Sequence, residues 1–144
     1  MQAALAEARK AVAEGEVPVG AVLADIHSGR IVSKGRNQCI GLNDPSAHAE
    51  IIALRRAGRI RKNYRLQDTV LVVTLEPCLM CLGAIVQARV AGLVFGARDP
   101  RAGALFSRHD ILDFAWIHSK FWIVEGVLEH ECLDLLQDFF RNRR

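Results

Sequence analysis

The fold of this chain is decided by the stretch Thr69-Val70-Leu71-Val72-Val73-Thr74-Leu75-Glu76-Pro77-Cys78-Leu79-Met80-Cys81. Residues 69–75 are a continuous β-branched and apolar run, which is the pattern of a buried central strand. Pro77 follows, and proline is favoured at the first position of a helix. Cys78 and Cys81 would then lie on one face of the first helical turn. Two thiols are therefore expected at the carboxyl end of a strand, where open α/β sheets usually bind ligands.

Upstream of this stretch stands His48-Ala49-Glu50, at the start of a second predicted helix. Two thiolates and one imidazole form a ligand set that favours zinc over magnesium or calcium. Structural zinc usually has four protein ligands, whereas catalytic zinc keeps a position open for water. His48, Cys78 and Cys81 thus indicate a catalytic site with one Zn²⁺ per subunit, and Glu50 is an unliganded carboxylate beside it. This spacing is that of zinc-dependent nucleobase deaminases.

The cysteines allow two other interpretations. A Cys-x-x-Cys pair at a strand-to-helix junction can be a redox pair, but the upstream histidine and carboxylate argue against it. A four-ligand structural zinc would need another residue, such as Cys39 or Cys132. Cys132 falls in an apolar stripe of the last predicted helix and is expected in the core, whereas Cys39 is expected in a loop. The remaining histidines show no ligand spacing and are expected to be ordinary surface or packing residues: His27, His109, His118 and His130.

The whole chain reads as one domain, residues 1–144, large enough to bury a proper core. The expected helices are 3–14, 45–58, 78–89 and 127–141, and the expected strands are 17–24, 31–36, 69–75, 91–95 and 121–124. Strands 17–24 and 31–36 should form a hairpin that turns at Ser28-Gly29. Alternating strands and helices predict an α/β fold, a three-layer α/β/α sandwich with a mixed central sheet.

Composition excludes several classes of protein. Half of the residues are hydrophobic (51%), so the chain is not disordered. No apolar run reaches the length of a membrane span, so no membrane association is expected. Residues 1–10 do not read as a secretory signal, and four cysteines with two committed to metal suggest a reducing compartment. A cytoplasmic location is the resulting expectation.

A net charge of +3 does not by itself identify a nucleic-acid binder. Its distribution is more informative, because six basic residues fall within eleven positions with no acid among them: Arg55, Arg56, Arg59, Arg61, Lys62 and Arg65. Near the carboxyl terminus, Phe139 and Phe140 precede Arg141. Basic side chains beside aromatic ones suit a phosphate backbone with unstacked bases, although such a run can also be only a solvated face.

Several motifs together resemble the bacterial tRNA-specific adenosine deaminases, which have a cytidine-deaminase-like fold. They span nearly the whole chain: residues 15–22 (GEVPVGAV), Asn37, 44–50 (DPSAHAE), 63–66 (NYRL), 74–81 (TLEPCLMC), 95–99 (FGARD) and 138–141 (DFFR). The resemblance implies zinc-dependent hydrolytic conversion of adenosine to inosine at the wobble position of a tRNA anticodon. It also implies a homodimer whose partner is the anticodon stem-loop.

The resemblance further implies roles for individual residues. His48, Cys78 and Cys81 would hold the zinc, and Glu50 would be the proton shuttle. Residues similar to the family's substrate-binding ones are Asn37, Ala49, Asp99, Phe139, Phe140 and Arg141. Asn37 would hydrogen-bond the purine, with the backbone of Ala49 beside the base. Asp99 would lie near the sugar-phosphate, and the three carboxy-terminal residues near the anticodon loop.

Segment 104–122 departs from the family pattern. Leu105-Phe106 replaces small residues, and Trp116-Ile117-His118 stands where an Asn-His pair is usual. Two alternative functions stay open at this point. One is a deaminase of a free nucleobase, nucleoside or nucleotide of cytosine or guanine type. The other is a zinc-stabilised RNA-binding module without catalysis.

Overall fold

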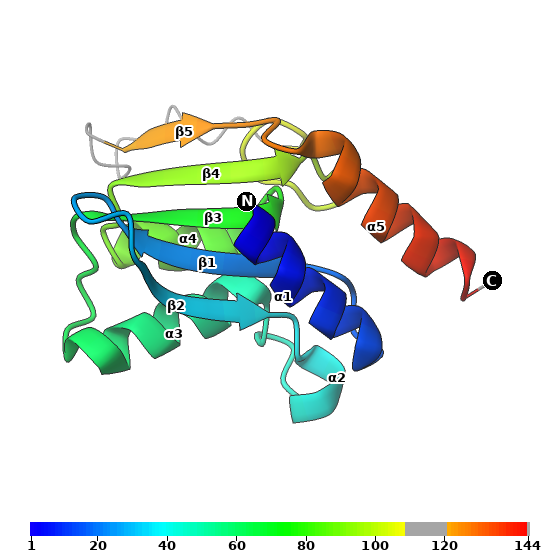
Figure 1. Cartoon of the computed structure of the whole chain (residues 1–144), viewed down its shortest axis with the longest axis horizontal. Helices are drawn as coiled ribbons and strands as arrows, with labels where there is room; N and C mark the ends of the chain where they lie inside the picture. Colours follow the sequence, from blue (N-terminus) through cyan, green and yellow to red (C-terminus); the bar gives the residue numbers. More distant parts are fainter. Residues whose placement is uncertain (109–120, 144) are drawn as a thin grey trace.

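The computed structural model describes residues 1–108 and 121–143. Five strands form one sheet in the order β2-β1-β3-β4-β5 (Figure 1). The strands are β1 (Gly20–Asp25), β2 (Ile31–Arg36), β3 (Thr69–Leu75), β4 (Gly92–Ala97) and β5 (Trp122–Val124). β1 is antiparallel to β2 and β3, whereas β3, β4 and β5 are parallel. The predicted mixed sheet is confirmed.

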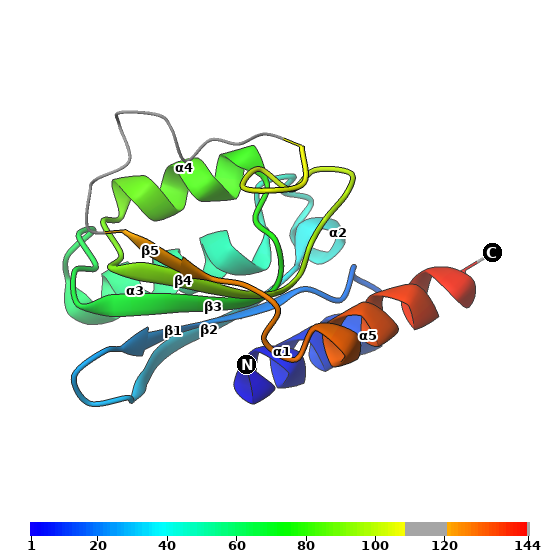
Figure 2. The same cartoon turned by 90° about the horizontal axis from the view of Figure 1, so that it is seen from above.

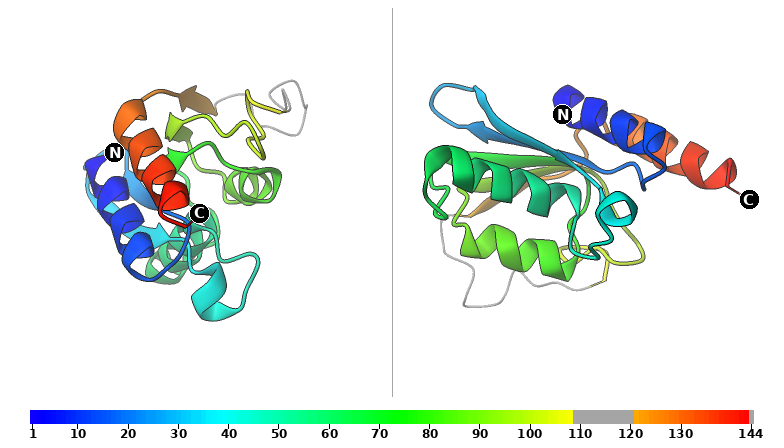
Figure 3. Two further views of the ribbon diagram at one scale, coloured as in Figure 1. Left: turned by 90° about the vertical axis from the view of Figure 1, so that its right-hand side faces the viewer. Right: turned by 90° about the horizontal axis from the view of Figure 1, so that it is seen from below.

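Helices cover both faces of this sheet, as Figures 2 and 3 show. One face carries α1 (Gln2–Ala13) and α5 (Glu129–Arg141), and the other carries α3 (Ala49–Arg61) and α4 (Leu79–Gln87). The predicted three-layer α/β/α sandwich is therefore confirmed. None of the helices in the described part of the chain is long and apolar enough to cross a bilayer.

Small residues let α1 and α3 approach the sheet closely. Gly20 in β1 faces Ala4 and Ala8 of α1, and a Cβ atom at position 20 would lie 2.5 Å from the Ala8 backbone nitrogen. Gly35 in β2 faces α3 in the same way. Ala4 and Ala8 are fully buried, so these contacts bring helix backbone against strand backbone with little side chain between them.

The two helices that carry the metal motif begin later than expected. Asp44 Oδ1 accepts hydrogen bonds from the Ser46 backbone N–H (2.8 Å) and from its hydroxyl (2.7 Å). This turn occupies the residues expected to open a helix over 45–58, so α3 begins only at Ala49, with His48 as its N-cap. The helix expected over 78–89 likewise begins at Leu79, with Cys78 as its N-cap.

A short helix, α2 (Cys39–Leu42), occupies a segment expected to be a loop. Glu16, far away in sequence, accepts hydrogen bonds from the Ile40 and Gly41 backbone N–H groups, each at 2.8 Å. These are the N–H groups that a helix start leaves without an intrahelical partner. Such a long-range cap has no local sequence signal.

Other boundaries shift by a few residues. The strand expected over 17–24 begins at Gly20, the strand expected over 91–95 extends to Ala97, and the last helix begins at Glu129. Much of the atypical segment, including the expectations for His109 and for residues 116–118, lies outside the described residues. Within the described part, Leu105 is fully buried whereas Phe106 is exposed.

Candidate active site

The three predicted ligands come together where two helices begin. His48 is the N-cap of α3, Cys78 is the N-cap of α4, and Cys81 lies in the first turn of α4. The Nδ1 atom of His48 lies 3.5 Å from the Cys81 sulfur and 3.7 Å from the Cys78 sulfur. All three ligand atoms lie within 4.8 Å of one another. β3 ends at Leu75, so the cluster sits at the carboxyl end of the central strand.

These distances fit a tetrahedral zinc ion. Zinc binds sulfur at about 2.3 Å and imidazole nitrogen at about 2.0–2.1 Å, so a tetrahedral ion separates its N and S ligands by about 3.5 Å. The donor set and its spacing therefore match Zn²⁺. In residues 1–108 and 121–143, the metal-binding group contains no fourth His, Cys, Asp or Glu. A three-ligand group leaves one coordination position for water, as catalytic zinc requires.

The charges of the three ligands are coupled through direct contacts. A hydrogen bond from the Cys81 thiol, followed by one from His48, lowers the pKa of Cys78 to about 4. The same Cys78 thiolate, together with burial, raises the pKa of Cys81. Hydrogen bonding to Cys78 raises the pKa of His48. One thiolate is thus ready for a cation, and the second gives up its proton when the cation arrives, since thiolate rather than thiol binds metal.

Glu50 lies two residues after His48 in the first turn of α3, and only 3% of it is exposed. Burial raises the pKa of its carboxyl to about 7, and a hydrogen bond from its own backbone N–H, followed by the charge of His48, opposes this shift only in part. A carboxyl that titrates near neutral pH can both accept and release a proton during one reaction. Its position and chemistry suit a general acid–base residue beside the metal ligands.

Asn37 and Ala49 are brought together by one hydrogen bond. Asn37 follows β2 directly, and its Oδ1 accepts the Ala49 backbone N–H at 2.9 Å. Ala49 is the first residue of α3, whose N–H has no intrahelical partner. The bond therefore holds the start of α3, including His48, against the end of β2. It also uses the oxygen of the Asn37 amide and leaves its NH₂ group as the donor.

Three of the other four candidate substrate-binding residues, Asp99, Phe140 and Arg141, meet at a groove beside α5. This α5 groove has a volume of about 850 Å³ and is lined by Val17, Leu75, Asp99, Pro100, Arg101, Leu136, Gln137, Phe140, Arg141 and Arg143. The sequence had placed Asp99 and Arg141 in separate motifs, and the fold brings them to one surface. Phe140 is 41% exposed, whereas Phe139 is buried. The Arg143 guanidinium covers the Phe139 ring at 4.3 Å.

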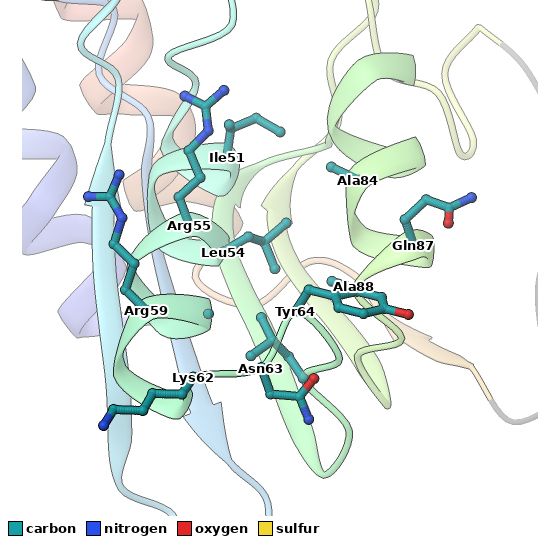
Figure 4. Close-up of a pocket in the computed structure, with 12 residues that line it drawn as sticks. Ile51, Leu54, Arg55, Arg59, Lys62, Asn63, Tyr64, Ala84, Gln87 and Ala88 are labelled. Atoms are coloured by element: carbon teal, nitrogen blue, oxygen red, sulfur yellow. The ribbon is translucent and has the colours of Figure 1, made fainter.

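A second cavity of about 740 Å³ lies between α3 and α4. Figure 4 shows Ile51, Arg55 and Arg59 on α3 at one side of it and Ala84 and Gln87 on α4 at the other. We call it the α3–α4 groove.

The basic cluster of residues 55–65 does not form one free cationic face. Arg55 pairs with Asp44 at 3.5 Å, and Arg61 pairs with Asp25 at 2.6 Å. Arg56 donates to the Lys34 carbonyl oxygen. Half of the cluster therefore serves the fold.

The two alternative zinc ligands, Cys39 and Cys132, lie outside the metal cluster. Cys132 is buried in the core, as predicted, and packs with Leu5 and Ala97. Cys39 is half-buried at the start of α2 rather than in the expected loop. Neither belongs to the group of His48, Cys78 and Cys81, so the geometry does not support a closed four-ligand site.

One residue with a conspicuous environment was not singled out from the sequence. Glu76 immediately precedes Pro77, yet it is 2% exposed. Its carboxylate accepts hydrogen bonds from four backbone N–H groups and one hydroxyl of segment 99–107. The only available signal was its position in the motif, a carboxylate between a buried strand and a metal ligand.

Fold and site together define a zinc-dependent deaminase. The family model for the cytidine and deoxycytidylate deaminase zinc-binding region matches residues 1–97, a span that contains all three predicted metal ligands and Glu50. The predicted enzyme class and its zinc cofactor are thereby confirmed.

Individual relatives narrow this class. The chain is 48% identical to the tRNA-specific adenosine deaminase of Haemophilus influenzae, over 100% of this chain and 83% of the relative. It is 43% identical to the same enzyme of Buchnera aphidicola subsp. Schizaphis graminum, over 100% and 93%. A solved structure from a study of A-to-I editing by tRNA:A34 deaminases superposes with a TM-score of 0.89 at 40% identity, covering 94% of this chain and 97% of that one. The chain belongs to the tRNA-specific adenosine deaminase family.

Proposed function

We propose that this protein hydrolyses adenosine to inosine at the wobble position of a tRNA anticodon and releases ammonia. The observation that carries the reaction is the open three-ligand group with Glu50 buried beside it. The substrate is supported by the relatives, whose names specify tRNA adenosine deamination. A tRNA substrate is consistent with the cytoplasmic location expected from the sequence.

His48, Cys78 and Cys81 hold the zinc ion in this proposal. When bound, zinc supplies a Lewis acid that lowers the pKa of water toward roughly 7. Glu50 accepts one proton from the attacking water and delivers it to N1 of the adenine. It then accepts the second proton, from the hydroxyl group added at C6, and passes it to the amino group, which leaves as ammonia while the C6 carbonyl forms. The pKa of Glu50, raised by burial to about 7, suits a group that must carry the proton in both directions.

The remaining residues position the base and the RNA. Asn37 donates its NH₂ group to the purine, because its oxygen is already held by Ala49. The α5 groove takes the flanking nucleotides, with Asp99 near the sugar-phosphate and Arg141 near phosphate. Phe140 offers an exposed ring for stacking, which suits unstacked single-stranded RNA. Phe139 supports this surface from below, since it is buried against the fold.

A homodimer is part of the same proposal. Tyr64 (68% exposed) lines the α3–α4 groove together with Ile51 and Leu54, so this groove presents apolar surface to solvent. A second copy packed against the groove would bury the Tyr64 ring. Sedimentation equilibrium of the wild type and of Tyr64→Asp tests the interface. The variant should be monomeric, and a variant that dimerises like the wild type excludes this face.

The test of the reaction is inosine formation in an anticodon stem-loop RNA with a wobble adenosine, followed by mass spectrometry. Wild type should produce inosine, whereas Glu50→Ala should produce none and still contain zinc. Glu7→Gln is the matched control, because Glu7 is equally buried but pairs with Lys10 and Arg36 on the α1 side of the sheet. Activity in zinc-loaded Glu50→Ala would refute the role of Glu50.

The second candidate function is deamination of a free purine base. It is favoured by one observation, the 38% identity with a Bacillus subtilis guanine deaminase structure, over 67% of this chain at a TM-score of 0.63. Ammonia release from guanine at a rate equal to that from the stem-loop would favour this function. The single substitutions Phe140→Ala and Arg141→Ala separate the two, since they should impair only an RNA substrate.

A further inference from the structure

Glu76 is a buried carboxylate with no task in the reaction described above. Within residues 1–108 and 121–143 the Glu76 carboxylate forms no salt bridge, and all of the hydrogen bonds that its oxygens accept come from one loop. Oε1 accepts the backbone N–H groups of Leu105 (2.9 Å), Phe106 (2.7 Å) and Ser107 (3.1 Å). Oε2 accepts the Asp99 backbone N–H (3.1 Å) and the Ser107 hydroxyl. A buried charge that forms no salt bridge is tolerated only when hydrogen bonds replace its hydration.

The same loop is also attached to the metal-binding segment. The Ala104 backbone N–H donates to the Pro77 carbonyl oxygen at 3.0 Å, and Cys78 forms an isolated antiparallel bridge with Gly103. Gly103 passes so close to Glu76 that a Cβ atom there would overlap the carboxylate. Segment 99–107 therefore turns around one carboxylate group, with a metal ligand at one side of the turn.

Asp99 connects this turn to the α5 groove. Its backbone N–H is held by Glu76, and the residue lines the groove together with Phe140 and Arg141. Glu76 thus fixes a groove residue relative to the strand that ends beside Cys78. We propose that Glu76 is a positioning residue that sets the place of Asp99, and with it RNA affinity, a role that rests on the proposed function.

Glu76→Gln tests this role selectively. A glutamine that keeps its oxygen at the Oε1 position still accepts the three N–H groups of residues 105–107. Its NH₂ group then faces the Asp99 N–H, and two donors cannot bond. The Ser107 hydroxyl can rotate to accept instead. The substitution therefore releases Asp99 while the rest of the turn stays bound.

The expected result is a KM for the stem-loop RNA roughly tenfold higher, with kcat within about twofold and zinc content unchanged, since a hydrogen bond to a charged group is lost. Asp99→Ala should also raise KM, and the double variant should be no worse than Asp99→Ala alone. Such non-additivity distinguishes action through Asp99 from general destabilisation. Glu7→Gln, at a buried carboxylate on the other face of the sheet, should lower Tm but leave KM unchanged.

Two results would overturn the proposal. One is a double variant whose increase in KM is the product of the increases in the two single variants. The other is a Glu76→Gln variant whose Tm is lowered while its KM for the stem-loop RNA equals that of the wild type. If Glu76→Gln does not fold, Gly103→Ala displaces the same turn without removing the charge. It should raise KM without adding to Asp99→Ala, and a normal KM would count against the role.

Amide hydrogen exchange tests the positioning role of Glu76 independently of the proposed function. Glu76→Gln should speed exchange at Asp99 and leave Leu105 and Phe106 protected. If wild type makes no inosine, the proposed function fails, whereas exchange at Asp99 still decides whether Glu76 positions it. Unchanged exchange at Asp99 refutes the positioning.

Discussion

We expect Gly35→Ala to displace the metal site relative to the sheet without substituting a metal ligand. Gly35 lies in β2, where a Cβ atom would sit 2.6 Å from the Ala53 backbone nitrogen and closer still to the Ala49 carbonyl oxygen. Ordinary contact begins at 3.4 Å, so α3 must move away from the sheet by about 0.8 Å or more. His48 and Glu50 lie at the start of this helix and must move with it.

The expected cost follows from two tolerances. Overpacking a close contact destabilises a fold by about 1–3 kcal/mol. A metal site tolerates deviations of only about 0.2 Å, so a displacement of this size should weaken zinc binding roughly 10–100-fold, as loss of a supporting residue does. Zinc retention against a competing chelator, together with a thermal melt, measures both effects.

Gly58→Ala is the matched control for this prediction. Gly58 lies in the same helix, and a Cβ atom there would meet its nearest neighbour beyond the adjacent helical backbone, the Asn63 carbonyl oxygen, at an ordinary 3.5 Å. Alanine in place of an interior helical glycine should stabilise the fold by about 0.5–1 kcal/mol. If Gly35→Ala holds zinc as tightly as the control does, the close approach of β2 and α3 does not position the site.

Three further predictions concern stability. Gly20→Ala forces a Cβ atom against the α1 backbone at Ala4, so Tm should fall while zinc content stays at wild-type level, because α1 carries no ligand; zinc loss would contradict this separation. Hydrogen bonds from the Ser28 backbone and the Arg61 guanidinium hold the pKa of Asp25 below its ordinary value of 3.8. The Asp25 charge therefore stabilises the fold above about pH 4, and this stabilisation is lost as the pH falls further. Asp25→Asn should lower Tm at pH 7 and flatten the dependence of Tm on pH in acid. A curve of Tm against pH that runs parallel to that of the wild type would refute this. Removing zinc with a chelator should lower the free energy of unfolding by about 4 kcal/mol, relative to zinc at a thousand times its Kd; an unchanged melt would show that the metal does not stabilise the fold.

Much of the architecture was predictable because it depends on local patterns. The apolar run of residues 69–75 is long enough to specify a central strand, and its place before Cys78 fixes which end of the sheet carries the metal. Helix starts were predicted less well. The hydrogen bonds of Asp44 to Ser46 shorten a helix that the sequence pattern alone extends to residue 45.

The candidate site divides in the same way. His48, Cys78 and Cys81 were predicted from the sequence as zinc ligands because a metal imposes residue types and spacing on its ligands. The partner of Asn37 and the whole environment of Glu76 had no such signal, since backbone N–H groups are the same in every residue. The α5 groove joins Asp99 to Arg141 across a long separation in sequence, which only the packing of α5 establishes.

The sequence by itself therefore determined the layered α/β fold, and it predicted His48, Cys78 and Cys81 as zinc ligands and Glu50 as the acid–base carboxylate. Tertiary structure alone decided the distances between the ligand atoms, the raised pKa of Glu50 and the turn around Glu76. Strands, helices and metal-ligand motifs depend on side-chain patterns among residues close together in the sequence, so they can be predicted from the sequence. Burial and backbone hydrogen bonding between distant segments depend on how the layers pack, because the groups that exclude water or donate N–H come from elsewhere in the fold.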